Sequence, residues 1–129
     1  MRLCVVSGLL ALFFAQNAYA LDSSVVRQLD ALTPRERLEQ RCDIEAMNRI
    51  AKDSRQFRPD KVIAYTFAKT VASGNRLSAP GAVFRSREHW YRLKYTCQTG
   101  NNHLDVTSFT YQVGAEVPKA SWSKYYLYN

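Results

Sequence analysis

Only a few residues of this sequence combine the types and spacing of catalytic groups. The histidines are His89 and His103, and His103 stands two residues before Asp105. Residues two apart on a strand share a face, so this pair can interact. A Ser-His-Asp hydrolase also needs a nucleophile within reach, which the sequence does not reveal. A strand-end histidine beside a turn is more often part of a polar surface. We therefore expect a non-catalytic protein and keep a small hydrolase, or hydrolase accessory, using His103 and Asp105 as the alternative.

Other chemical patterns in the sequence are weak. Ser121 and Lys124 have the S-x-x-K spacing of penicillin-recognising enzymes, but the S-D-N and K-T-G motifs are missing. The carboxylate pairs Glu36/Glu39 and Glu39/Asp43 alternate with arginines, which indicates a solvated helix face rather than a glycosidase dyad. The sequence contains no CxxC, no HExxH and no glycine-rich phosphate loop. It predicts neither a metal site nor a cofactor.

A basic cluster is the best candidate for a binding site. Its cationic and aromatic side chains come from a short stretch: Arg85, Arg87, His89, Trp90, Arg92 and Lys94. If residues 82–87 and 89–98 form paired strands, these side chains can line one solvated sheet face. Such a face suits an anionic envelope polymer, a phosphorylated lipid head group or an envelope protein. The alternative is a basic face that only keeps the protein soluble.

The N-terminus looks like a secretory signal peptide. Arg2 precedes an apolar run over residues 3–15, and Ala18-Tyr19-Ala20 fits the small-x-small cleavage rule. The run is shorter than the ~20 residues of a spanning helix, and an uncleaved anchor is the alternative. We expect cleavage near Ala20–Leu21, one mature domain over residues 21–129 without a membrane span, and a periplasmic or secreted location. Export argues against nucleic acid as a partner, although the net charge of +7 would suit it.

Cleavage of the expected signal peptide would remove Cys4 and leave two cysteines, Cys42 and Cys97. An even number of cysteines in an exported chain predicts a disulfide. Because this bridge closes a long loop, the loop-entropy model gives it roughly 4 kcal/mol of stabilisation. Two separate buried thiols are the alternative.

The strongest secondary-structure signal is the start of a long helix. Thr33 has the character of an N-cap, Pro34 suits the first helical position, and Glu36 completes a capping box. The helix is expected to run from Pro34 to about Asp53, after a shorter helix over residues 21–32 that Asp22 or Ser23 caps. One apolar side of the long helix should meet the sheet: Leu38, Cys42, Ala46 and Ile50.

The opposite side of the long helix carries Ile44, Met47 and Ala51. Packing against the shorter helix explains this stripe most simply. The alternative is a protein-interaction or inhibitor module, since methionine adapts to varied partner surfaces.

Alternating residues predict strands in the second half of the chain. In residues 89–98, Tyr91, Leu93, Tyr95 and Cys97 share one face, which the disulfide would make the core face. The expected strands cover residues 61–68, 82–87, 89–98, 104–113 with a bulge near Thr107-Ser108, and 122–128, with an irregular stretch over 70–81. The sum is an α+β domain in which one or two N-terminal helices pack on an antiparallel meander sheet of about four strands.

Several long segments also match a known pattern in order along the chain. They are RLEQRCD-x-x-AMNRI (37–50), FRPD-KVIAY-x-FA (57–68), GN-x-L-x-APGA-x-FRSR (74–87), WYRL-x-Y-x-C-x-T (90–99) and the W-x-x-YYLY ending. Together they resemble an alphaproteobacterial family of exported proteins, the domain of unknown function numbered 930. The resemblance implies a small exported domain and carries over no catalytic or binding residue.

Overall fold

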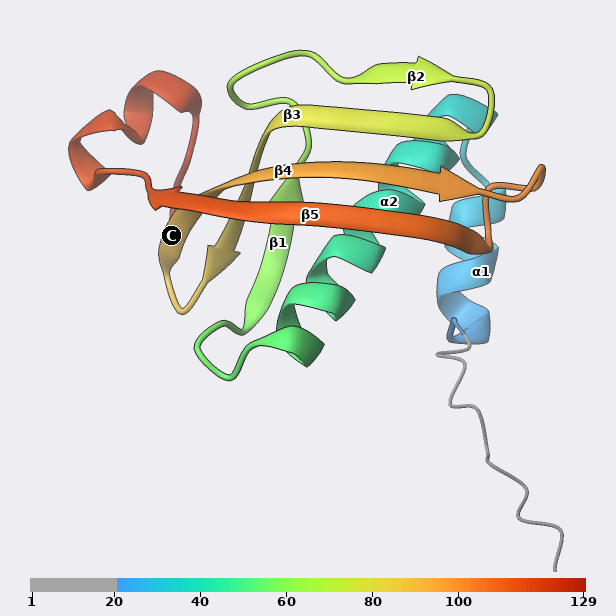
Figure 1. The fold of residues 1–129 in the computed structure, drawn as a ribbon, viewed down its shortest axis with the longest axis horizontal. Helices are drawn as coiled ribbons and strands as arrows, with labels where there is room; N and C mark the ends of the chain where they lie inside the picture. The colour runs from blue at the N-terminus through green and yellow to red at the C-terminus, as the bar shows by residue number, and fades with distance from the viewer. Residues whose placement is uncertain (1–20) are drawn as a thin grey trace, which may run out of the picture.

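The computed structural model describes residues 21–129, so the expected signal peptide and Cys4 lie outside the described residues. Two helices pack on a five-stranded antiparallel sheet, which confirms the predicted α+β class (Figure 1). In chain order the elements are α1 (Ser23–Asp30), α2 (Pro34–Asp53), β1 (Pro59–Ile63), β2 (Val71–Ser73), β3 (Arg76–Ser86), β4 (His89–Thr99) and β5 (Val106–Glu116). Two short 3-10 turns follow, η1 (Lys119–Ser121) and η2 (Ser123–Tyr125).

The sheet contains five strands, where the sequence predicts about four, and their positions differ from the expected ones. Its order is β1-β3-β4-β5, and β2 pairs with the first half of β3 while β1 pairs with the second half. The stretch 70–81, expected to be irregular, instead forms β2 and the beginning of β3. The expected short strand over 82–87 is the end of β3. Between these halves, the register of β3 against β4 shifts between Ala79 and Ala82.

The strand predicted over residues 61–68 is β1, which ends at Ile63. A close backbone contact explains why it does not continue to Ala68. The carbonyl of Gly81 accepts a hydrogen bond from the Phe67 N–H at 2.8 Å. A Cβ atom on Gly81 would collide with the backbone of Ala68, so only glycine lets the chain approach β3 here. The loop after β1 therefore folds over the register shift of β3.

The predicted bulge in β5 is confirmed. Gln98 lies opposite Ser108 and Thr99 opposite Val106, so Thr107 is the extra residue.

Both helices begin at the predicted caps. At the start of α1, the Asp22 carboxylate accepts a hydrogen bond from the Ser24 N–H at 3.0 Å. The helix itself is shorter than the expected range of 21–32. At α2, Thr33 and Glu36 exchange the two side chain–backbone bonds of a capping box, and the helix has the predicted bounds. The sequence chemistry of the caps therefore determines where the helical layer begins.

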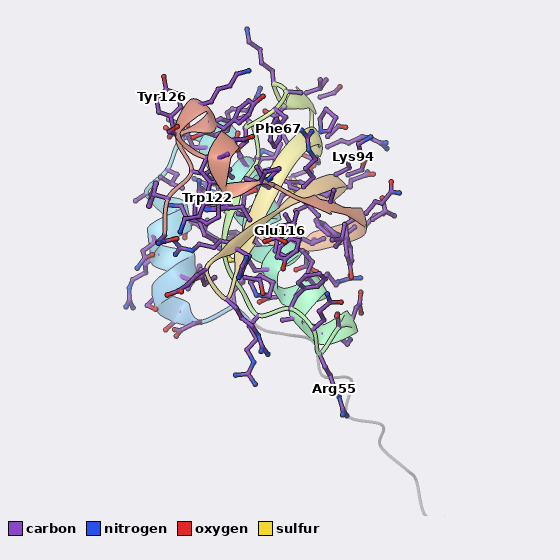
Figure 2. The ribbon with its side chains drawn as sticks, turned by 90° about the vertical axis from the view of Figure 1, so that its left-hand side faces the viewer. Arg55, Phe67, Lys94, Glu116, Trp122 and Tyr126 are labelled. Atoms are coloured by element: carbon purple, nitrogen blue, oxygen red, sulfur yellow. A yellow bond between two sulfur atoms is a disulfide. The ribbon has the colours of Figure 1, made fainter. Side chains whose placement is uncertain are left out.

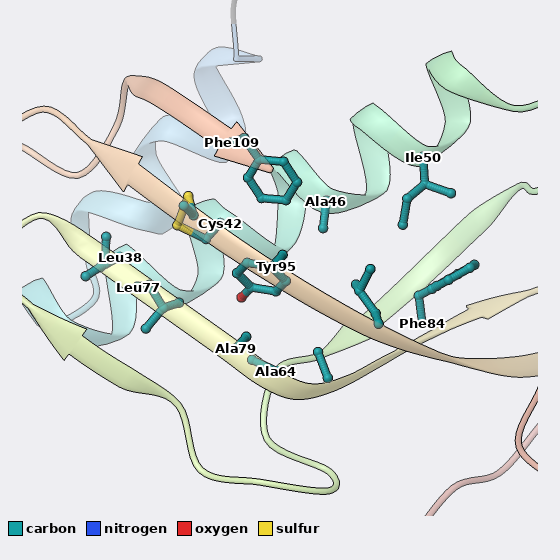
Figure 3. Close-up of a cluster of buried hydrophobic side chains, with 13 residues drawn as sticks. Leu38, Cys42, Ala46, Ile50, Ala64, Leu77, Ala79, Phe84, Tyr95 and Phe109 are labelled. Atoms are coloured by element: carbon teal, nitrogen blue, oxygen red, sulfur yellow. A yellow bond between two sulfur atoms is a disulfide. The ribbon is translucent and has the colours of Figure 1, made fainter. Parts of the chain in front are cut away.

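The main core lies between α2 and one face of the sheet, the inner face (Figure 3). The predicted apolar side of α2 supplies its helical residues, which are at most 1% exposed: Leu38, Cys42, Ala46 and Ile50. Leu93, Tyr95 and Cys97 of β4 are buried beneath them, as predicted, and Tyr91 is partly buried. The predicted disulfide joins Cys42 to Cys97 with their Cα atoms 5.9 Å apart. It ties the helix to the middle of the sheet.

The prediction of a final strand over 122–128 is wrong. After η1 and η2, Tyr126 adopts a left-handed conformation with φ of 58°, and the Leu127 N–H bonds to the Trp122 carbonyl at 2.9 Å. This turn directs Trp122 and Leu127 onto the outer face of the sheet, opposite α2. There they bury a second apolar cluster that contains Val83, Trp90, Val117, Trp122 and Leu127.

Candidate functional site

The basic cluster of residues 85–94 does not form one solvated face. The prediction that Trp90 faces solvent is wrong, because its side chain is 0% exposed. Its indole N–H donates to the Tyr128 carbonyl at 2.9 Å, and Trp122 and Leu127 belong to the same buried cluster. The physical reason is the C-terminal segment, which folds over this end of the outer face instead of extending the sheet.

Two basic side chains of the cluster are paired with carboxylates. Arg85 donates two hydrogen bonds to Asp60, at 2.9 and 3.2 Å, and its guanidinium lies 5.7 Å from the Trp90 ring. The hydrogen bond to Asp60 raises the pKa of Arg85. The His89 ring contacts the Glu116 carboxylate. Both side chains are engaged by carboxylates within the fold and offer little to a ligand.

Arg87 belongs to the turn between β3 and β4. Arg87 and Glu88 both have positive φ, 50° and 68°, and both are exposed. Since they form the tip of this hairpin, Arg87 is not part of the sheet face that the sequence predicted.

Arg92 and Lys94 remain at a shallow groove on the outer face. The groove, here called the Arg92 groove, has a volume of about 200 Å³ and is lined mainly by Phe67, Pro80, Gly81, Arg92, Lys94 and Gln112. The Arg92 guanidinium lies 3.8 Å from the centroid of the Phe67 ring, and Lys94 faces Gln112 across β4 and β5. Figure 2 shows Phe67 and Lys94 on the same side of the molecule. Sequence reasoning missed Phe67 because it placed this residue in a strand.

The groove has the chemistry of a weak anion site. Arg92 and Lys94 are exposed, and among the described residues neither forms an ion pair with a carboxylate. Stacking on Phe67 fixes the guanidinium plane and leaves N–H donors for an anion. The groove is smaller than the ~300–1,000 Å³ of typical small-molecule pockets, so it fits a surface contact better than an enclosed ligand.

The structure does not form the pair on which the hydrolase alternative depends. His103 lies in a turn with φ of 58°, and its Nδ1 is 3.0 Å from the Thr99 hydroxyl. Within residues 21–129, no hydrogen bond or ion pair joins His103 to Asp105, which is exposed.

Sequence reasoning also missed a buried acid. Asp43, which was expected on a solvated helix face, is only 6% exposed and accepts a hydrogen bond from the Tyr95 hydroxyl at 2.7 Å. Burial raises the pKa of Asp43 to about 7. The only available signal was its place next to Cys42, whose bridge draws this part of α2 onto the sheet. Asp43 and Glu39 border a hollow of about 380 Å³ between α2 and β1.

The second apolar side of α2 is divided between two environments. Ile44 shares a groove with Val25 and Leu29 of α1, as expected if this side packs against the shorter helix. Met47 is half-buried and borders the hollow beside β1, while Ala51 is exposed. Because Met47 is not fully buried, the interaction-module alternative keeps its basis.

The described residues, 21–129, contain neither a cluster of metal ligands nor a membrane-spanning helix. No group of three His, Cys, Asp or Glu side chains gathers there as a metal site. None of the helices in these residues has the length and apolarity needed to cross a bilayer.

Comparison with known proteins places the chain in a family. Residues 29–127 match the family model described as Domain of Unknown Function (DUF930). No curated protein and no solved structure matches the chain. The matched region includes α2, the whole sheet, the disulfide, the Arg92 groove and the C-terminal turns. The chain therefore belongs to the DUF930 family of domains of unknown function.

Proposed function

We propose that the protein is an exported, non-catalytic envelope protein whose Arg92 groove binds an anionic envelope component. One observation carries the proposal. Arg92 and Lys94 stay exposed on one face of β4 without a carboxylate partner among the described residues, whereas Arg85 and His89 of the same cluster are paired. An anionic partner would supply the missing counter-charges.

Two features support export. The pattern of residues 1–20 is that of a signal peptide. The Cys42–Cys97 bridge is of a kind that persists in oxidising compartments such as the periplasm. The proposed location is therefore the periplasm or the outside of the cell.

The exposure of the groove determines what kind of partner fits. Each exposed ion pair contributes only about 0.2–1 kcal/mol. A single small anion would therefore bind weakly, while a polymer or surface that repeats its charge gains by multivalency. This favours an envelope polymer or a charged layer over a free metabolite.

The test measures binding of the purified mature protein to dextran sulfate, with neutral dextran as the matched polymer. We expect binding to dextran sulfate alone, weakening with salt as the Debye length falls from about 30 Å at 0.01 M to about 8 Å at 0.15 M. The double variant Arg92→Gln/Lys94→Gln should bind about tenfold more weakly, since two lost contacts total about 1.4 kcal/mol.

The matched control removes two exposed arginines outside the groove, one in α1 and one in the loop after α2, Arg27→Gln/Arg55→Gln, and should leave the affinity nearly unchanged. Equal losses in both double variants would mean that net charge, and not the groove, binds the polymer. Equal binding of dextran and dextran sulfate would contradict the proposal.

A further inference from the structure

A second hollow, the C-terminal pocket, lies between β1 and the C-terminal turns and has a volume of about 540 Å³. Tyrosine, lysine and one threonine dominate its lining: Lys61, Tyr65, Thr66, Lys124, Tyr126 and Tyr128. None of these residues lines the Arg92 groove. The volume falls within the ~300–1,000 Å³ range of ligand sites.

The backbone around this pocket is anchored on both sides. The Leu127 side chain is buried, and its N–H bonds to the Trp122 carbonyl at 2.9 Å. The Tyr128 carbonyl accepts the Trp90 indole N–H at 2.9 Å. The rings of Tyr126 and Tyr128 are therefore held at the rim of the pocket by a fixed main chain.

The exposed aromatic surface of the described chain gathers at this pocket. Tyr65, Tyr126 and Tyr128 are 62%, 86% and 55% exposed, and the fourth large exposed hydrophobic residue is Val71 on β2. Tyr126 also has φ of 58°, a left-handed conformation that costs a bulky residue about 1–2 kcal/mol. Figure 2 shows Tyr126 at the outer edge of the C-terminal turns. Strain and exposure at one aromatic residue together indicate a binding role.

The charge of the pocket is positive. The Lys61 ammonium donates to the Tyr128 hydroxyl at 2.8 Å and lies 5.1 Å from its ring centroid. This hydrogen bond lowers the pKa of Tyr128. The Lys124 ammonium lies 5.4 Å from the Tyr125 ring. No carboxylate side chain is among the lining residues, so the two lysines attract an anion.

An unpaired hydroxyl lines the same pocket. Within residues 21–129, the Thr66 Oγ1 is the one buried side-chain oxygen or nitrogen atom without a hydrogen-bond partner. An unsatisfied buried polar group costs about 1–3 kcal/mol. Rotation of the Thr66 side chain toward the pocket would let a ligand hydroxyl bond to it and remove this cost, so the pocket favours a ligand rich in hydroxyl groups.

We propose that the C-terminal pocket binds a sugar unit that carries a carboxylate or a phosphate, as part of an anionic glycan. The tyrosine rings stack on the apolar face of the sugar ring, the lysines meet the anionic group, and Thr66 meets a sugar hydroxyl. A lipid surface fits less well, because the rings border a hollow. This inference goes beyond the proposed function by assigning a second site, and it rests on the proposed export for access to such glycans.

The experiment is calorimetric titration of the mature protein with three sugars. Tetragalacturonate tests the carboxylate, glucose 6-phosphate tests the phosphate, and maltotetraose is the neutral control. We expect at least one anionic sugar to bind and maltotetraose not to bind. The variants Tyr126→Asn and Lys124→Gln should each lower that affinity about tenfold. Asparagine tolerates the left-handed conformation, so Tyr126→Asn should fold normally.

Two matched variants separate this proposal from the proposed function. Val71→Thr removes the exposed hydrophobic residue outside the pocket and should bind the sugar as the wild type does. Arg92→Gln/Lys94→Gln alters the other site and reports whether the sugar binds there instead. If the sugar affinity falls only in Arg92→Gln/Lys94→Gln, the pocket assignment is wrong and the Arg92 groove stands. Equal binding of maltotetraose, or no binding of any sugar while dextran sulfate still binds, also overturns the pocket proposal alone.

Discussion

The two faces of the sheet are closed by different means. On the inner face, a long capped helix and a disulfide bury a core built from residues at helical and strand spacing. On the outer face, an irregular C-terminal segment covers one end only, and its side chains Trp122 and Leu127 pack around Trp90. The comparison teaches that periodic patterns determine the inner face, while a few large side chains on irregular backbone determine the outer one.

Both proposed binding sites lie on the outer side, at the margins of this cover. The Arg92 groove lies where Phe67 rests against β4, and the C-terminal pocket lies where Tyr126 and Tyr128 project from the turns. Incomplete coverage leaves cations and rings accessible there. On the inner face, the corresponding positions are occupied by helix α2.

Removing the disulfide should have the largest effect and tests whether the two faces unfold together. The variant Cys42→Ala/Cys97→Ala should lose about 4 kcal/mol of unfolding free energy, since the bridge spans 55 residues. Urea unfolding followed by far-UV circular dichroism reports the helices. Both tryptophans of the chain lie in the outer cluster, so their fluorescence reports the other face.

Coincident transitions in the two signals would mean that both faces form one cooperative unit. A fluorescence transition that stays in place while the dichroism transition moves would separate them. A variant as stable as the wild type would contradict the importance of the bridge.

Truncating Trp122 sharpens the comparison from the outer side. Trp122→Ala should cost about 3 kcal/mol, because it removes a large buried ring and the hydrogen bond that its indole N–H donates to the Val117 carbonyl at 3.0 Å. The remaining Trp90 should become solvated, and its emission maximum should move to longer wavelength. Tyr126→Asn, in the same segment, is the control that removes little buried surface, because Tyr126 is 86% exposed. An unchanged Trp90 emission would show that the C-terminal cover does not depend on Trp122.

The sequence predicted the inner face of the sheet better than the outer face. The α2 bounds, the cap at Thr33, the bulge at Thr107 and the Cys42–Cys97 bridge were predicted, because each depends on local spacing or on cysteine pairing. The pattern of WSKYYLY indicated a strand, but this segment forms η2 and the left-handed turn at Tyr126, since aromatic residues spaced along irregular backbone produce the same pattern.

The candidate site was predicted only in part for the same reason. The exposure of Arg92 and Lys94 follows from the alternation in β4, and their sequence positions were sufficient to place them on the outer face. The pairing of Arg85 with Asp60 and the burial of Trp90 depend on segments far away in the chain. Local patterns contain no information about such contacts.

The buried acid Asp43 gives the inner face a pH dependence that the outer face should lack. Its pKa is about 7 in the folded protein against an ordinary 3.8, so the folded state holds a proton that the unfolded state releases. Stability should therefore fall as the pH rises from about 4 to about 7 and stay level above that. The full pKa difference corresponds to about 4 kcal/mol of unfolding free energy. We expect a loss of about 2 kcal/mol, because Asp43 borders an open hollow.

The control for this prediction is Asp43→Asn, which keeps an acceptor for the Tyr95 hydroxyl and removes the titration. Urea unfolding at several pH values should show a level profile for the variant over this range. It should also be more stable than the wild type at pH 8. A wild-type profile that rises between pH 4 and 7 would show that other groups outweigh Asp43.

The smallest expected effect concerns the N-cap of α2. There the stabilising contribution should rise with pH, opposite to that of Asp43 on the same helix. Thr33→Ala should cost about 1 kcal/mol, since it removes an N-cap side chain. Hydrogen bonds from Thr33 lower the pKa of Glu36, so the contribution of this carboxylate is present above its ordinary pKa of 4.5 and is lost as the pH falls. The penalty of Thr33→Ala should therefore shrink in acid, whereas that of Trp122→Ala should not. A penalty for Thr33→Ala that stays constant with pH would mean that Glu36 does not take part in the cap in solution.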